Sequence, residues 1–271
     1  ADRFTFLQGQ LTNDVTKLGN ELMSAGYCSP KGRLLATPRL FQEGDTIGMI
    51  VAASNADYLV KRLKMYVLRS KVTIERAADR EVAGFVGSAP TNLGDGALVF
   101  ELPCALPQAR IAAALPSGLG LTIVPKGTAC AGSEPLWWAA CAAAGQSWVF
   151  GETAERFTPH AVNLDLIGGI SFNKGCYTGQ EVVSRIEHIG KTNRRTVLLA
   201  ANDPLELAPG TDLTDNQGQV VATVLYGAKL ADRTLLLAEV STETAQSEVA
   251  LDTTAATLHR LPLPYGWTRT K

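Results

Sequence analysis

The sequence has no apolar run long enough to span a bilayer, and its start lacks a basic segment followed by an apolar one. It also lacks an excess of charge, since the formal net charge is −1 over 271 residues. A chain without a positive field is not drawn as a whole to nucleic acid or to an anionic membrane. These absences predict a soluble, cytoplasmic protein that binds neither membranes nor nucleic acid directly.

Metal-binding and redox motifs are equally absent. None of the cysteines forms a C-x-x-C pair, and none of the three histidines lies at ligand spacing from another histidine or a cysteine. Reduced thiols and no protein-held metal are therefore expected. The five cysteines are Cys28, Cys104, Cys130, Cys141 and Cys176. The chain starts at Ala1 in a helix-like stretch, so we expect a leading segment to precede it in the native protein.

The first two thirds of the chain alternate between strand-like and helix-like patterns. Residues 4–11 have helical spacing and end in a polar turn at 12–14. A capping box at Ser54 predicts a helix to Arg69, and Ser133 with Pro135 predicts another that Gly145 stops. A further helix is expected over 107–115, and strands over 27–41, 46–53, 71–75, 81–87 and 121–124. This order predicts α+β units with antiparallel sheets.

From Arg195 onward the pattern changes to strands separated by turn signals such as Asp215-Asn-Gln-Gly218. Strands are expected over 196–200, 219–226, 234–240 and 256–261. We therefore predict a small all-β domain, a barrel, over residues 195–271, after an α+β region of two interleaved units over 1–190.

Cys176 is the first candidate for chemistry. Thr178-Gly-Gln-Glu181 has capping-box spacing, and Gly190 is placed to end the helix that would follow. Cys176 then lies just before a helix N-terminus with Lys174 two residues away, which favours the thiolate. A buried, inert cysteine is an equally good reading of the spacing alone.

The wider motif carries a resemblance. Gly168-Gly-Ile-Ser-Phe-Asn-Lys-Gly-Cys-Tyr-Thr-Gly-Gln-Glu-Val-Val-Ser-Arg185 resembles the signature of the bacterial YgfZ family. The likeness extends through Leu7-Gln-Gly-Gln-Leu-Thr-Asn-Asp-Val15, Lys31-Gly-Arg33 and Tyr66-Val-Leu-Arg-Ser-Lys-Val72 to Leu261-Pro-Leu-Pro-Tyr265. This family is related to the aminomethyltransferase, or T-protein, of the glycine cleavage system.

The resemblance implies a ring of two ferredoxin-like units and a C-terminal barrel around a folate-binding channel. It implies tetrahydrofolate or a derivative as cofactor, and a role in the assembly or repair of iron-sulfur proteins, including enzymes that thiomethylate tRNA. Those client proteins would be transient partners. Cys176 takes the family's functional cysteine position, and Asp14 matches an aspartate that assists the folate amine in aminomethyltransferases. Without the resemblance, Asp14 reads as a loop-capping residue.

Other residues of the motifs are expected to contact the folate. Trp137 offers an indole face for stacking on a pterin, although core packing is a close alternative. The related helix commonly ends in Glu-Ala-Gly, whereas this one ends in Ala143-Ala144-Gly145, so a carboxylate is missing. The remaining expected folate contacts are Asn13, Lys174, Tyr177, Gln180, Glu181 and Arg185.

The sequence contains two groups of cations, one near these motifs and one on a predicted helix. Arg185, Lys191, Arg194 and Arg195 form a local positive cluster, in which Arg185 is the expected anion contact and Arg194 and Arg195 are expected to be solvated. Lys61, Arg62 and Lys64 are interpreted as the wet face of a helix without a function.

The leading hypothesis is a tetrahydrofolate-binding accessory protein for iron-sulfur proteins that supports tRNA thiomethylation indirectly. A folate-dependent aminomethyltransferase that uses Asp14 is the first alternative. A non-catalytic interaction module is the second.

Overall fold

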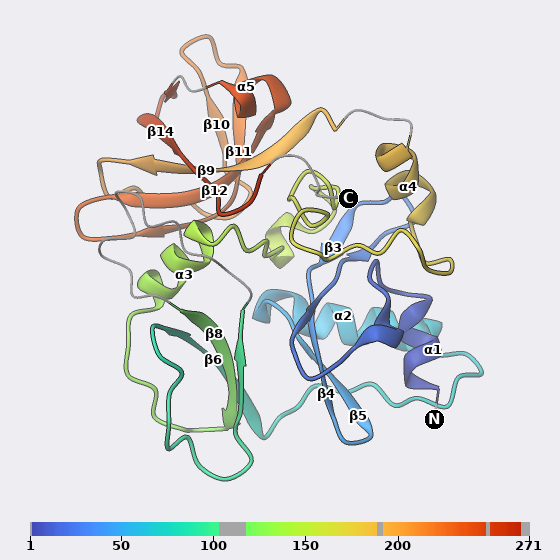
Figure 1. Cartoon of the computed structure of the whole chain (residues 1–271). Coiled ribbons are helices and arrows are strands. Elements are labelled where there is room, and N and C mark those ends of the chain that lie inside the picture. Colours follow the sequence, from blue (N-terminus) through green and yellow to red (C-terminus); the bar gives the residue numbers. More distant parts are fainter. Residues whose placement is uncertain (1, 103–117, 189–191, 248–249, 267–271) are drawn as a thin grey trace. The chain divides into compact units, whose positions relative to one another are not determined.

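The computed structural model describes residues 2–102, 118–188, 192–247 and 250–266. The chain divides into two compact units, each built from separate stretches (Figure 1). The first unit contains the residues up to Arg76 together with Ser147–Arg195. The second contains Ala77–Gln146 together with Thr196–Gly266.

The first unit contains short antiparallel sheets and the helices beside them. One sheet has the order β1-β4-β5, and β2 pairs with β3. Its strands are β1 (Met23–Ser24), β2 (Tyr27–Cys28), β3 (Leu34–Ala36), β4 (Arg39–Glu43) and β5 (Thr46–Ile50). Its helices are α1 (Arg3–Gln8), α2 (Ala53–Tyr66) and α4 (Gln180–His188), with 3-10 turns η1 (Val15–Lys17) and η3 (Gly151–Thr153).

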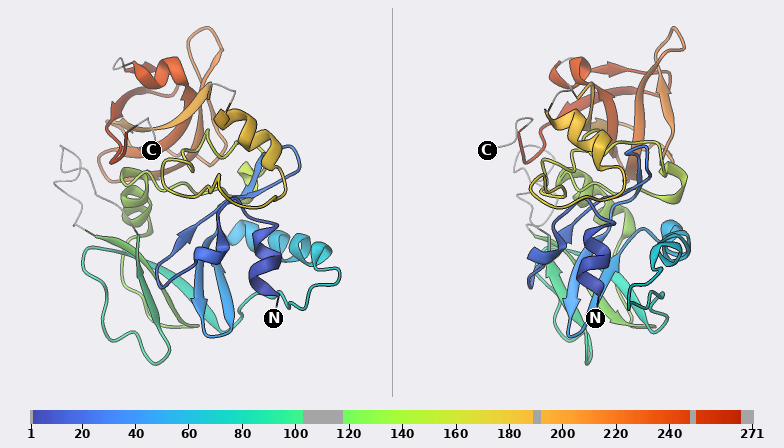
Figure 2. Two further views of the ribbon diagram at one scale, coloured as in Figure 1. Left: turned by 45° about the vertical axis from the view of Figure 1, so that its right-hand side comes forward. Right: turned by 90° about the vertical axis from the view of Figure 1, so that its right-hand side faces the viewer.

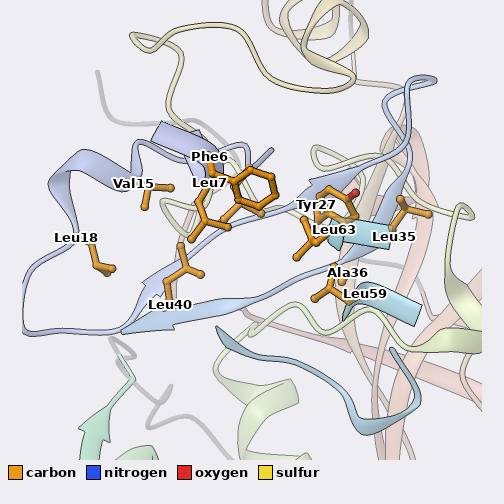
Figure 3. Close-up of a cluster of buried hydrophobic side chains, with 12 residues drawn as sticks. Phe6, Leu7, Val15, Leu18, Tyr27, Leu35, Ala36, Leu40, Leu59 and Leu63 are labelled. Atoms are coloured by element: carbon orange, nitrogen blue, oxygen red, sulfur yellow. The ribbon is translucent and has the colours of Figure 1, made fainter. Parts of the chain in front are cut away.

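The core of this unit is a cluster of buried apolar side chains drawn from α1, the strands and α2 (Figure 3). Leu59 and Leu63 of α2 lie beside Tyr27, Leu35 and Ala36. Two leucines four positions apart share one helix face, so α2 presents this face to the strands. The opposite face of α2 is left outside the cluster.

The second unit begins with an antiparallel sheet of order β6-β8-β7, against which helix α3 packs. The strands are β6 (Arg80–Val86), β7 (Leu98–Glu101) and β8 (Leu119–Pro125), and α3 is Glu134–Ala143. The Ser133 hydroxyl accepts the Leu136 N–H, and Gly145 has a φ of 63°, which confirms both predicted ends of this helix.

A six-stranded antiparallel sheet completes the second unit, in the order β10-β11-β12-β9-β14-β13. Its two edges approach each other. The Thr254 N–H after β13 donates to the Thr214 carbonyl of β10 at 2.8 Å. The sheet is therefore curled into an incomplete barrel, drawn in orange and red (Figure 2). Its strands are β9 (Arg194–Ala201), β10 (Asp212–Thr214), β11 (Val220–Lys229), β12 (Thr234–Ser241), β13 (Leu251–Asp252) and β14 (Thr257–Leu261), and α5 is Thr242–Gln246.

The expected α+β class and the strand-rich C-terminal part are confirmed. Within the described residues, no helix combines the length and the apolar character needed to cross a membrane. The predicted helix over 107–115 lies outside the described residues.

Several local predictions were wrong, including the single strand run expected over 27–41, which is divided among β2, β3 and β4. Residues 71–75 form no strand, because Val72 and Ile74 pack against the core as an extended segment outside any strand pairing. The capping box at Ser54 is absent: the helix N-cap is Ala52, and the Ser54 hydroxyl accepts the Gly151 N–H at 2.9 Å instead. Helix α2 ends at Tyr66, and Leu68 has a φ of 42° in the left-handed region.

Candidate functional site

The cysteine motif is a loop that precedes α4, and its first anchor is Lys174. The ammonium nitrogen Nζ donates to the carbonyl oxygens of Gln8, Leu11 and Asn13 at 2.8, 2.6 and 2.9 Å. A lysine ammonium has three N–H donors, so these three acceptors use all of them. Burial lowers the pKa of Lys174 to about 8. The same ammonium lies 5.0 Å from the centroid of the Tyr177 ring.

The second anchor is Gly179, at the other end of the loop. Its φ is 82°, and a Cβ there would lie 2.5 Å from the Ser29 carbonyl oxygen and 3.1 Å from the Gly32 Cα. Only glycine fits such a conformation at such a contact. The Lys31-Gly-Arg33 turn and the cysteine motif therefore pack backbone against backbone.

Cys176 lies between these two anchors and is exposed. The next residue, Tyr177, is buried, and its burial beside Cys28 raises the pKa of its hydroxyl. Cys28 is itself fully buried, which raises the pKa of its thiol to about 12. The loop thus buries Tyr177 and presents the Cys176 side chain to solvent.

The capping box predicted at Thr178 was wrong. Helix α4 begins at Gln180, and the Val183 N–H bonds to the Gly179 carbonyl, so Gly179 occupies the N-cap position. With Thr178 as cap, Gly179 would need helical backbone angles, which its φ of 82° excludes. The predicted end at Gly190 lies outside the described residues.

The segment that carries Asn13 and Asp14 is joined to the start of the cysteine motif. The Asn13 amide donates to the carbonyls of Ser24 and Gly168, both at 2.8 Å. The Thr12 hydroxyl donates to the Gly169 carbonyl at 2.6 Å. Together with Lys174, these bonds hold the two motifs as one structural piece, although more than 150 residues separate them.

The surroundings of the Asp14 carboxylate favour its ionised form. Its Oδ1 accepts from the Thr16 hydroxyl at 2.6 Å and the Gln8 amide at 2.8 Å, while Oδ2 lies 3.5 Å from the Lys17 ammonium. The Thr16 bond is the main cause that lowers the pKa of Asp14, with Gln8 and Lys17 acting in the same direction. Asp14 is therefore ionised at neutral pH, and Oδ2 retains capacity to accept a further hydrogen bond.

The residues expected on α4 are mostly exposed. Glu181 and Arg185, four positions apart, form an ion pair at 2.8 Å, and both side chains are largely in solvent. Such a pair contributes only about 0.3–0.5 kcal/mol, so either partner is available to another charge. Gln180 is half-buried at the first turn of the helix.

Trp137 belongs to the second compact unit, whereas the residues above belong to the first. Its indole N–H donates to the Gly120 carbonyl at 3.4 Å, and its ring lies 4.6 Å from that of Trp138 in an edge arrangement. The ring also lies over Gly84, where a Cβ would come within 2.0 Å of Nε1. One face of the indole is thus already packed on strand β6, and the residue is half-buried.

The structure contains a buried ionic cluster that was not predicted from the sequence. The expectation that Arg195 is solvated was wrong. Arg195 makes two bonds to the Asp165 carboxylate, at 2.7 and 2.9 Å, and one to the His160 carbonyl. His160 Nε2 lies 3.3 Å from Glu187, and burial lowers the pKa of this histidine. Lys191 lies outside the described residues.

The side chains of His160, Asp165 and Glu187 bring potential metal-ligand atoms within 4.8 Å of one another. Arg195 occupies both oxygens of Asp165, however, and places a fixed positive charge beside the group. The arrangement is that of a buried ion-pair network rather than of a cation site. Its sequence signal was weak, because its members span 35 residues without a motif.

The chain is similar to known proteins along nearly its whole length. No protein-family model matches the chain. The tRNA-modifying protein YgfZ of Yersinia pestis (strain Pestoides F) is 32% identical over 292 residues, which covers 98% of this chain and 88% of the relative. The protein of the same name from Cronobacter sakazakii (strain ATCC BAA-894) is 32% identical over 296 residues, with the same shares covered.

A solved structure shows the same fold at much lower identity. The glycine cleavage system aminomethyltransferase T from Bartonella henselae matches with a TM-score of 0.65, over 99% of this chain and 82% of that one, at 13% identity. This likeness concerns the fold alone, whereas the identity to the curated relatives extends along nearly the whole chain. The chain belongs to the YgfZ family, on a fold like that of the glycine cleavage aminomethyltransferase.

Proposed function

We propose that this protein binds tetrahydrofolate or a derivative and supports the assembly or repair of iron-sulfur proteins in the cytoplasm, with Cys176 as its reactive group. Through those client proteins it supports tRNA thiomethylation without binding tRNA itself. The observation that carries the proposal is the exposed Cys176 held between the anchors Lys174 and Gly179. The names of the relatives, tRNA-modifying protein YgfZ, support the connection to tRNA modification.

The anchored loop supports a chemical role for the thiol. An ordinary exposed loop costs little to reposition, whereas this loop is held by three charge-assisted bonds and a close glycine contact. Fixing an exposed side chain in this way reduces the entropy lost when it meets a partner or a reactant. Cys28 is buried without such access, so the two thiols of this region differ in accessibility.

The residues near the loop suit a folate in their chemistry. A pterin presents N–H donors along one edge, and the ionised Asp14 has an oxygen with spare acceptor capacity. Arg185, which pairs with the exposed Glu181 among the described residues, is available to a glutamate-tail carboxylate. Trp137 belongs to the second unit and stays a prediction for ring stacking.

The principal experiment is rescue of cells that lack their own family member. Wild type and Cys130→Ser should restore thiomethylated tRNA, measured by mass spectrometry of digested tRNA, whereas Cys176→Ser should not. Cys130 is the matched control because it is also an exposed free cysteine. Normal rescue by Cys176→Ser would overturn the role of the thiol. Tetrahydrofolate binding by calorimetry should be equal in all three proteins, and its absence in wild type would overturn the folate proposal.

An aminomethyltransferase is the second candidate, and the ionised Asp14 favours it. In this case the carboxylate would assist proton transfer at the folate amine. The end of α3 argues against an aminomethyltransferase. Ala143 is a buried alanine at the position where the resemblance implies a glutamate. The two functions separate in an assay of methylene transfer to tetrahydrofolate: turnover lost in Asp14→Asn and kept in Cys176→Ser would replace the first proposal by the second.

A further inference from the structure

The outer face of helix α2 concentrates exposed apolar side chains. Seven large apolar residues are exposed in the described part of the chain, and four of them lie between positions 58 and 68. Leu68 is 88% exposed, Met65 58% and Tyr58 45%. Single exposed apolar residues are ordinary on protein surfaces, but a group on one element marks an interaction site. We call Tyr58, Met65 and Leu68 the α2 stripe.

The α2 stripe follows one face of the helix, with Lys61 between Tyr58 and Met65. Tyr58, Lys61 and Met65 follow one another at spacings of three and four, which places them in a line along the helix, and Leu68 follows just after its end. Leu59 and Leu63 on the opposite face hold the helix against the core. The α2 stripe is therefore presented by an anchored helix.

Positive charge predominates along the α2 stripe, although the exposed Asp57 at its start pairs with Arg76. From Tyr58 to Ile74 the sequence contains five cations and no acidic residue, in a chain whose formal net charge is −1. Lys61, Lys64 and Arg69 are exposed and make no ion pair or hydrogen bond through their side chains with the described residues. Arg62 differs, since it lies over the Tyr66 ring at 5.9 Å and interacts with Tyr27, so the expectation of a wet position was wrong for Arg62.

The backbone conformation of Leu68 also indicates an interaction site. A leucine with a φ of 42° adopts a conformation that non-glycine residues rarely take, at a cost on the order of 1 kcal/mol. The strained residue points its side chain into solvent, where it contributes no core packing. Strained positions of this kind gather at binding sites, where a partner contact offsets the strain.

We infer that the α2 stripe and its cations form the docking surface for an acidic protein segment that carries apolar side chains. An apolar centre with a charged rim is the usual composition of a protein interface, and methionine, tyrosine and arginine are enriched there. Nucleic acid is the poorer fit, because Met65 and Leu68 have aliphatic side chains that neither neutralise phosphates nor stack on bases. The inference rests on the proposed function in one respect, that the partner is an iron-sulfur client.

A binding experiment tests the surface without reference to folate. The probe is a fluorescein-labelled peptide of about 20 residues, long enough for a helix, with leucine at every third or fourth position and glutamate between them. We expect it to bind the wild type, and the double variant Met65→Ser/Leu68→Ser to bind at least about tenfold more weakly. The matched control is Val220→Ser, another exposed apolar residue, on β11.

Charge is tested in parallel. Lys61→Glu/Lys64→Glu should also weaken binding by at least about tenfold, whereas Lys126→Glu, an exposed lysine after β8, should not. Absence of peptide binding, or equal binding of a peptide with the same composition in scrambled order, would overturn the inference. So would competition by bulk tRNA that depends on Lys61 and Lys64 but not on Met65 and Leu68, because the surface would then bind nucleic acid.

Rescue of tRNA thiomethylation connects the surface to the client. Lys61→Glu/Lys64→Glu should fail to restore thiomethylated tRNA while its thermal midpoint and its affinity for tetrahydrofolate stay at wild-type values. Full rescue by this variant would refute the client assignment. If the wild type itself fails to rescue, the proposed function fails, and the peptide experiment still decides whether α2 is a docking surface.

Discussion

Lys174→Met tests whether the lysine ammonium holds the cysteine loop in place. Methionine keeps an unbranched, flexible stem and removes all three donors to the carbonyls of Gln8, Leu11 and Asn13. The loop would lose three of its hydrogen bonds to the N-terminal segment and keep the one from the Ser171 N–H to the Thr12 carbonyl. We expect the variant to fold and to expose the 171–179 stretch more readily.

The expected loss of stability follows from the three carbonyls. A buried polar group left without a partner costs about 1–3 kcal/mol. The site is only partly buried, so water replaces some of the lost hydrogen bonds. Removal of the buried charge also removes its desolvation cost, which offsets a further part of the loss. We therefore expect the free energy of unfolding to fall by about 2–3 kcal/mol at pH 7, part of a total that is typically 5–15 kcal/mol.

The pH dependence provides a second signature. The pKa of Lys174 is about 8 in the folded protein and 10.5 in its ordinary state, so between these values the unfolded chain binds more protons. The free energy of unfolding then gains a contribution that rises with pH from about 8 to 10.5. At 1.36 kcal/mol for each pKa unit the upper limit is about 3 kcal/mol, which partial exposure reduces. Lys174→Met lacks this contribution, so its deficit against wild type should grow over the window.

Urea unfolding of both proteins at several pH values measures the effect, with Lys126→Met as the control for loss of an exposed lysine. The control should stay within about 0.5 kcal/mol of wild type. Hydrogen exchange should show faster exchange over residues 171–179 in Lys174→Met alone. A variant with wild-type stability would refute the assignment of Lys174 as an anchor, and a deficit that does not change between pH 8 and 10.5 would refute the lowered pKa.

Three further experiments test other parts of the site. Gly179→Ala should lower the free energy of unfolding by about 1–3 kcal/mol, whereas Gly175→Ala, which meets nothing within 4 Å, should be nearly neutral in the same urea titration. Arg195→Leu should cost about 3–5 kcal/mol by leaving Asp165 charged and buried; a thermal midpoint equal to wild type would contradict the ion-pair network. The Cys28 thiol should react with a thiol reagent only on unfolding, and rapid labelling of the native protein at this position, located by peptide mass mapping, would contradict its burial and raised pKa.

Local patterns explain which parts of the fold could be predicted from the sequence. The ends of α3 were recognised because a capping serine, an early proline and a final glycine act within a few residues. The strands β9, β11, β12 and β14 of the curled sheet were recognised because their apolar pattern is strong, whereas the two- and three-residue strands β13 and β10 were not predicted. The 71–75 segment shows the limit of this reasoning, since alternation reveals which side chains face the core but not whether a neighbouring strand pairs with them.

The candidate site divides in the same way. Sequence by itself determined that Cys176 belongs to a glycine-containing motif, that Asp14 lies in a polar turn after a helix-like stretch, and that the chain is of α+β type, because these features depend on neighbouring residues. Only the tertiary structure decided that the Lys174 ammonium bonds carbonyls more than 160 positions away, and that Arg195 is buried against Asp165. Their partners are distant along the chain, and a charged side chain has the same local signature whether it meets water, a carbonyl or a carboxylate.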